Sequence, residues 1–426
     1  MFSIIRNGFK VKEIRKKYLF TFLMLLVYRL GNIIPVPFMK HDVIKEIMTN
    51  TESGIIGLLN LLSGGSLSKM SVFALSIYPY ITASIIIQLL TIAIPRLGEI
   101  AKEGEQGQKK IGFYTKIGAV ILGIFEGYAL VQGMLFRAID AKGSLEMSII
   151  LITILAGSMF LIWLGDLITE RGIGNGISIL IFLGIVSGLP EQFGSWIFNV
   201  KAGYMHPLKL AGLIIAVLIM VYIVVLINEG ERKVPVQYAK RVVGRKMYGG
   251  QSTHIPVKVN MAGVMPVIFS SSVLTLPNHL ALLFGYADVP NWYKQLFTVE
   301  GNIGVWMYSI INLLLVILFA YFYTAIQFNT VEYAKNLQQY GGFIPGIRPG
   351  KPTGEYLQKI SNKITFIGAL SLALIASAPI ALSKVTGQRL NFGGTSIIIV
   401  VGVVIETVKQ IEALLTMRHY KGFLNK

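Results

Sequence analysis

The stretch Ile55–Thr91, IIGLLNLLSGGSLSKMSVFALSIYPYITASIIIQLLT, decides how this chain folds. It opens with a short apolar piece, Gly57–Leu62, which is too short to cross a bilayer. Two consecutive glycines follow and let the backbone bend, and a full-length apolar run then extends from Ser71 to Pro95. A broken apolar segment is tolerated at membrane depth only where protein covers it or where it lines a water-filled cavity. The stretch therefore indicates either a pore or a re-entrant loop with a packing role.

The composition is that of an integral membrane protein with several helices. Of the 426 residues, 54% are hydrophobic and 14% are charged, whereas soluble domains carry about 25% charged residues. The chain has no cysteine, which excludes disulfides and thiolate chemistry. The basic N-terminal residues lead into an apolar run without a small-residue cleavage site, so we expect a retained first helix.

Apolar runs of about 20 residues predict ten membrane spans, in an all-α membrane protein. The predicted spans are Tyr18–Pro35, Val72–Ile94, Phe113–Leu135, Met147–Leu167, Ile177–Phe198, Leu208–Asn228, Met261–Phe284, Gly304–Gln327, Ile364–Ser383 and Thr395–Leu415. About three times as many Lys and Arg fall on the side of the N-tail as on the opposite side, so both termini are predicted to be cytoplasmic. Ten spans divide into two halves of five, which then have inverted orientations.

In chain order, this predicts a cytoplasmic N-tail over 1–17 and a first five-helix half over 18–200. A second half over 201–415 and a cytoplasmic C-tail over 416–426 follow.

Two predicted cytoplasmic loops, 229–260 and 328–363, are long and basic. In the first, Val and Tyr alternate with charges, which predicts a β-hairpin with Gly244 near its tip. The second contains a short amphipathic helix, Val331–Gln339, and a turn rich in Gly and Pro around Arg348. Juxtamembrane Lys and Arg ordinarily set orientation and contact anionic lipid. These charges lie far out in the loops, which favours a docking surface for a cytosolic partner.

The sequence contains no arrangement of residues typical of catalysis, cofactor binding or metal binding. The five histidines are scattered, and no phosphate-binding loop, GxSxG or HExxH motif occurs. Arg29, Glu126 and Glu406 are the main intramembrane charges, which is few for an ion-coupled carrier. We therefore predict that the chain is not an enzyme and has no cofactor, and the interrupted apolar segment leaves a pore as one interpretation. A solute transporter with inverted repeats is the alternative, and a lipid scramblase or insertase is a third class.

Isoleucines recur every four residues on two of the predicted spans, at Ile77, Ile81 and Ile85 and again at Ile177, Ile181 and Ile185. This spacing places each trio on one helix face. If the two faces meet, they form an apolar constriction of the kind that gates by excluding water. Ordinary helix packing explains the same spacing.

Several stretches resemble the SecY family, the central subunit of the bacterial protein-conducting channel. They lie in order over nearly the whole chain and are SGGSLSKMSVFALSIYPYITASIIIQLL (63–90), ERGIGNGISILIFLGIVSGLP (170–190), YAKRVVGRKMYGGQSTHIPVKVNMAGVMPVIFSSS (238–272), FIPGIRPGKPT (343–353) and GGTSIIIVVGVV (393–404).

The resemblance implies two five-helix halves around an hourglass pore, with a plug over residues 57–70 that closes the outer funnel. The plug positions named by the resemblance are Gly57, Leu58, Leu59, Asn60, Leu61, Leu62, Ser63, Gly64, Gly65, Ser66 and Leu67. The pore ring would consist of Ile81, Ile85, Ile181, Ile185, Ile268 and Ile399. Met265 stands where the family often has isoleucine, which puts a pore role for that position in doubt.

The resemblance also implies a lateral gate and a set of partners. The second and third spans would open against the seventh and eighth, with Thr82, Gln88 and Leu276 at this gate. Lys240, Arg241, Arg245, Lys246 and Arg348 would dock the ribosome or the SecA motor ATPase. The implied location is the bacterial plasma membrane, with SecE and SecG as small membrane subunits. Signal sequences and nascent polypeptides would pass through the pore or into the lipid bilayer.

Overall fold

The apolar runs form long helices, because a backbone surrounded by lipid must pair all its polar groups within its own segment. The computed structural model describes residues 2–51, 60, 63–133, 135–140, 143–238, 241–243, 246–248, 252–283, 302–386 and 393–424. The helices are α1 (Phe2–Lys10), α2 (Lys12–Gly31), α3 (His41–Thr51), α5 (Tyr78–Ala93), α6 (Pro95–Lys102), α7 (Glu105–Gly133), the 3-10 turn η1 (Phe136–Ala138), α8 (Ser144–Arg171), α9 (Gly176–Lys201), α10 (Pro207–Glu229), α11 (Met265–Leu283), α13 (Asn302–Gln327), α14 (Thr330–Gln339), α15 (Lys351–Thr386) and α16 (Gly394–Leu424).

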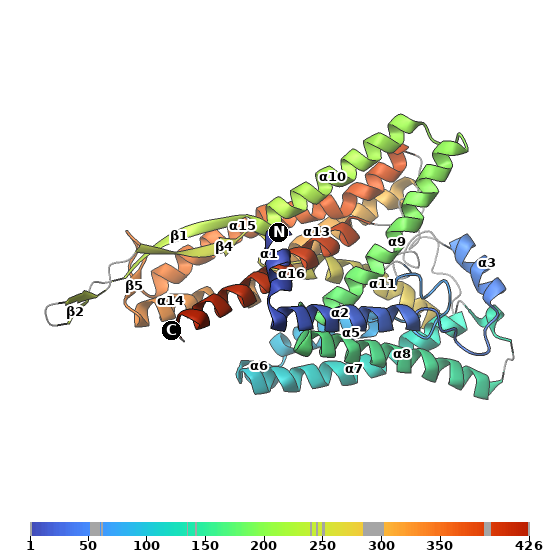
Figure 1. The fold of residues 1–426 in the computed structure, drawn as a ribbon, viewed down its shortest axis with the longest axis horizontal. Helices are drawn as coiled ribbons and strands as arrows, with labels where there is room; N and C mark the ends of the chain where they lie inside the picture. The colour runs from blue at the N-terminus through green and yellow to red at the C-terminus, as the bar shows by residue number, and fades with distance from the viewer. Residues whose placement is uncertain are drawn as a thin grey trace.

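The long helices pack as two groups that follow chain order. In the N-terminal helix group, α5 and α8 pack on α7, and α2 and α9 pack on α8. In the C-terminal helix group, α13 packs on α11 and α15, and α10 packs on α15 and α16. The groups meet where α7 contacts α11 and where α9 contacts α16 (Figure 1).

By length and composition, six helices of the described residues can cross a membrane, or seven if the bent pair α5 and α6 forms one span. The structure therefore supports a membrane protein with several spans, and the number of ten spans stays a prediction. The remaining three correspond to α2, α11 and α16. Charged residues lie within α2, and the described apolar part of α11 is short.

The predicted second span was wrong at its start, because α5 begins at Tyr78 rather than at Val72. Residues 71–77 are irregular, and Ser76 has a positive φ of 52°. Their backbone finds partners elsewhere, since the Val72 N–H donates to the Ile34 carbonyl at 3.0 Å. The Ser158 hydroxyl of α8 donates to the Ser76 carbonyl at 2.8 Å.

The far end of this span bends sharply, as α5 and α6 meet at 104°. Ile94 takes an extended conformation, with φ −109° and ψ 109°, directly before Pro95. A residue before proline disfavours the α region, so the helix ends here and restarts in a new direction.

The predicted hairpin and amphipathic helix are both confirmed. β1 (Glu231–Tyr238) pairs antiparallel with β4 (Ser252–Lys258), and β2 (Arg241–Val243) pairs antiparallel with β3 (Lys246–Tyr248). Gly244 lies outside the described residues. β5 (Gly342–Phe343) adds to the free edge of β1, and α14 follows an N-cap in which the Asn329 side chain accepts the Glu332 N–H. The strands project beyond the helices at one end of the molecule (Figure 1).

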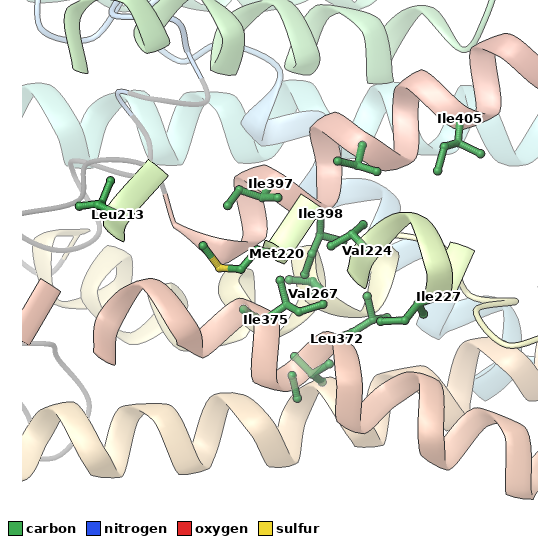
Figure 2. Packing of buried hydrophobic residues seen from close by; sticks show 14 of the residues in the cluster. Leu213, Met220, Val224, Ile227, Val267, Leu372, Ile375, Ile397, Ile398 and Ile405 are labelled. Carbon is green, nitrogen blue, oxygen red and sulfur yellow. The ribbon is translucent and has the colours of Figure 1, made fainter. Parts of the chain in front are cut away.

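Buried apolar side chains fill the space between the helices of each group. Figure 2 shows the largest such cluster, in which Met220 and Val224 of α10, Leu372 and Ile375 of α15 and Ile398 of α16 pack together. A separate cluster under the strands joins Val234 and Val236 to α14 and α15. The second cluster ties the projecting strands to the helical body.

Candidate functional site

Four helices from both groups bring the predicted isoleucines together. Ile181 and Ile185 of α9 and Ile399 of α16 are buried in one cluster. Ile81 of α5 and Ile268 of α11 pack against that cluster. The four-residue spacing on α5 and α9 therefore directs both faces towards one meeting point of the two groups.

The sixth isoleucine, Ile85, lies in an adjoining cluster with Phe269 and Tyr323. Ile81 and Ile268 border both clusters and connect them. The six residues thus form one continuous apolar contact, although their role as a pore ring stays a prediction.

Other residues at this meeting point escaped the sequence analysis. Val403 is buried in the same cluster, and Val264 packs against it. A Cβ built on Gly402 would lie 2.8 Å from Val264 Cγ1, so the residue directly before α11 approaches α16 closely there. Met265, by contrast, is 37% exposed and belongs to neither isoleucine cluster. Spacing on α11 and α16 alone gave no signal for these contacts.

The described part of the predicted plug is held against the N-terminal helix group. The Tyr28 hydroxyl of α2 donates to the Ser63 carbonyl at 3.2 Å. Gly64 has a positive φ of 65°, and a Cβ there would lie 2.9 Å from Ser187 Oγ and 3.1 Å from Gly184 Cα of α9. Only glycine allows this turn to approach α9 so closely.

The C-terminal part of the predicted plug is firmly packed. Ser66, Leu67 and Met70 are buried, and the Val36 N–H donates to the Met70 carbonyl at 3.0 Å. Asn60 also holds the turn, because its side-chain oxygen accepts the Ser68 N–H at 2.9 Å. The plug positions that lie outside the described residues are Gly57, Leu58, Leu59, Leu61 and Leu62.

The seam between α5 and α7 on one side and α11 and α13 on the other contains a cross-group hydrogen bond. The Tyr323 hydroxyl of α13 donates to Gln88 Oε1 of α5. Polar side chains on the neighbouring helices pair within one group, since the Ser270 hydroxyl of α11 donates to Asn312 Oδ1 of α13 at 2.5 Å. Sequence reasoning identified Gln88 but missed Tyr323, because the pair is far apart in the chain.

The other predicted gate positions have different surroundings. The Thr82 hydroxyl donates to the Tyr78 carbonyl at 2.9 Å and lies 3.4 Å from Glu126 Oε1 of α7. Both contacts stay within the N-terminal helix group. Leu276 lies on α11, and its side chain is outside the part of the chain that the structure describes. A gate role for either residue stays a prediction.

Three of the predicted docking residues lie within the described part of the chain: Arg241 on β2, Lys246 on β3 and Arg348 in the turn after β5. Arg348 is exposed, and its carbonyl accepts the Thr353 hydroxyl at 2.9 Å. Arg241 pairs with Tyr248, and Lys246 pairs with Val243 in the β2–β3 ladder. Lys240 and Arg245 are outside the described residues. Because β5 pairs with β1, the chain that leads into the Arg348 turn is joined to the sheet of β1 and β4.

Comparison with known proteins decides the family. The sequence profile of the SecY family matches residues 71–408. The chain belongs to the SecY family. Among curated relatives, the protein translocase subunit SecY of Streptomyces coelicolor is 44% identical, and that of Thermotoga maritima is 40% identical. The first alignment covers 100% of both chains, and the second covers 100% of this chain and 98% of the relative.

Solved structures agree on the fold. A protein-conducting channel structure matches with a TM-score of 0.69 at 19% identity, covering 94% of this chain and 92% of the other. Sec61 in the canine ribosome–channel complex matches with a TM-score of 0.63 at 18% identity, with the same two coverages. Membership of the SecY family makes the chain a multi-pass membrane protein and a translocase subunit. The solute-transporter alternative is therefore wrong.

Proposed function

We propose that this SecY-family chain forms a pore that passes unfolded secretory polypeptides across the plasma membrane and releases transmembrane segments sideways into lipid. The observation that carries the proposal is the meeting of isoleucines from α5, α9, α11 and α16, because these helices come from both groups. A translocating chain has no fixed sequence, so its pore needs a pliable apolar constriction rather than specific contacts.

The plug and the seam fit the same function. A turn seated on α2 and α9 by Tyr28 and Gly64 lies beside the isoleucine contact and can close it in the resting state. The seam between α5 and α13 is bridged by the Gln88–Tyr323 hydrogen bond and offers a sideways exit. An apolar segment gains roughly 0.3–0.6 kcal/mol for each Leu, Ile, Phe or Val at the centre of the bilayer, which favours release into lipid.

The driving force is proposed to come from cytosolic partners. The basic strands project from one end of the molecule (Figure 1), and the exposed Arg348 follows β5 of the same sheet. Both features suit docking of a SecA motor or a ribosome. Matching solved channels, Sec61 in a canine complex and Ssh1 in yeast, are bound to ribosomes. SecE and SecG are the proposed membrane partners, and the end that holds the strands is proposed to face the cytoplasm.

Reconstitution tests this function directly. The purified chain with its single-span partners is placed in proteoliposomes, and a SecA motor, ATP and a secretory precursor are added. We expect the precursor to become protected from external protease, whereas the same precursor without its signal sequence stays accessible. Equal accessibility of both precursors, with a folded channel present, would refute the proposal.

A further inference from the structure

The loop between α8 and α9 is held by side chains from both helix groups. The Ile173 N–H donates to Thr21 Oγ1 of α2 at 3.1 Å. The next N–H along the chain, that of Gly174, donates to Gln410 Oε1 of α16. Two adjacent backbone donors of one loop are therefore accepted by opposite groups, Thr21 from the N-terminal group and Gln410 from the C-terminal group.

An apolar contact reinforces the link to α16. Ile173 is buried in a small cluster with Ile14 of α2 and Ile411 of α16. Gly174 is buried as well, while Gln410 reaches it from an exposed position on α16. Leaving the buried Gly174 N–H without an acceptor would cost free energy, so its hydrogen bond to Gln410 stabilises the contact between the loop and α16. Helix α1 also packs on α16 near this end.

The position of this loop connects it to the isoleucine contact. α9 begins directly after the loop, and the Gly176 N–H is accepted by Thr169 Oγ1 at 2.9 Å. Ile181 and Ile185 follow on the same helix and meet Ile399 of α16. At its other end α9 is joined to α10 through residues 202–206. The two groups are thus tied covalently at one end of α9 and by the Gln410 contact at the other.

We propose that Gln410, together with Ile411, is a positioning residue that fixes the start of α9 to α16 and thereby keeps the isoleucine contact closed in the resting channel. The inference rests on the proposed channel function. Without this contact the groups can separate about the α9–α10 connection alone, which moves Ile181 and Ile185 away from Ile399.

The test compares resting ion conductance of full-length channels, with their membrane partners, in planar bilayers. Gln410→Leu removes the acceptor for the Gly174 N–H and is expected to raise resting conductance several-fold. Gln410→Glu keeps an acceptor oxygen and is expected to stay near the wild-type value. Ile411→Ala weakens the apolar part of the same contact and is expected to leak as Gln410→Leu does.

Thr21→Val is the matched control. It removes the acceptor of the neighbouring Ile173 N–H, but Thr21 belongs to the same group as the loop, so resting conductance is expected to stay unchanged. Thermal unfolding of each variant in detergent separates leak from general destabilisation. Equal conductance of Gln410→Leu and Thr21→Val, or leak that follows the melting temperature alone, overturns the inference. A wild-type channel that moves no polypeptide overturns the proposed function instead.

Discussion

At the scale of single residues, Gly157 of α8 marks the closest approach between that helix and the irregular segment before α5. A Cβ at this position would lie 2.0 Å from the Val72 carbonyl oxygen. Gly157→Ala is expected to destabilise the protein by about 1–3 kcal/mol, as overpacking of a filled site does. Gly212→Ala on α10 is the control, because nothing lies within 4 Å of its added Cβ. Thermal unfolding in detergent measures both, and equal melting temperatures would contradict the prediction.

The isoleucine contact gives a second prediction at this scale. Because six side chains are proposed to share the seal, replacing one of them by serine is expected to change resting conductance little. Successive replacement of Ile81, Ile181 and Ile268 is expected to raise it progressively, since each serine adds a polar group that favours water in the constriction. Planar-bilayer recordings measure the effect. Valine at the same positions is the control, and leak that is equal in the valine and serine series would contradict a dewetted seal.

At the scale of elements, the predicted plug segment includes residues that belong to the core of the N-terminal helix group. Leu67 and Met70 are buried among the core residues of the N-terminal helix group, so removing them also removes core. Deletion of residues 57–62 removes Asn60 and its hydrogen bond to Ser68 but leaves Leu67 and Met70 in the core, so it is expected to raise resting conductance while translocation survives. Deletion of 57–70 is expected to lower the melting temperature as well. Unchanged conductance in the shorter deletion would count against a plug.

The turn that carries Arg348 gives the prediction for the projecting end. Arg348→Glu is expected to abolish motor-driven translocation without loss of folding, because the side chain is exposed and only its carbonyl bonds to Thr353. Protease protection of a precursor in proteoliposomes measures the effect. Lys359→Glu on α15 makes the same charge change at another exposed position and is expected to be tolerated. Normal translocation by Arg348→Glu would refute a docking role.

The sequence predicted those elements whose signals are local. The hairpin and the helix before the Arg348 turn followed from alternation and amphipathic spacing within short windows, and both are present. The start of α5 was misjudged, because residues 72–77 are as apolar as a helix. Their irregular backbone depends on partners at Ile34 and Ser158, which are far away in the chain.

In the candidate site, too, only the features with a local sequence signal were predictable. Spacing placed Ile81 and Ile85 on one face and Ile181 and Ile185 on another, but only the resemblance to a known family supplied Ile268 and Ile399. The Tyr323 partner of Gln88 and the Gln410 partner of Gly174 depend on packing between the two groups. Periodicity within one helix carries no information about such pairs.

At the scale of the whole molecule, the two helix groups meet at a back contact, α9 with α16, and at a front seam, where α7 meets α11 and Gln88 bonds to Tyr323. A sideways exit needs one of these interfaces to open while the other holds. The covalent α9–α10 connection lies at the back. We therefore expect the front seam to be the interface that separates.

Locking the front seam tests this division. The chain has no cysteine, so Gln88→Cys with Tyr323→Cys introduces a unique pair. A short bifunctional thiosulfonate reagent, which bridges the two thiols through a disulfide at each end, is expected to stop both protease protection of a secretory precursor and release of an apolar segment into lipid. Reduction of these disulfides releases the bridge and is expected to restore both activities. Each single-cysteine variant under the same treatment is the control, because it loses the Gln88–Tyr323 hydrogen bond without gaining a bridge. Full activity of the bridged channel would show that polypeptides leave without separation of α5 from α13, and the seam would then be only a packing interface.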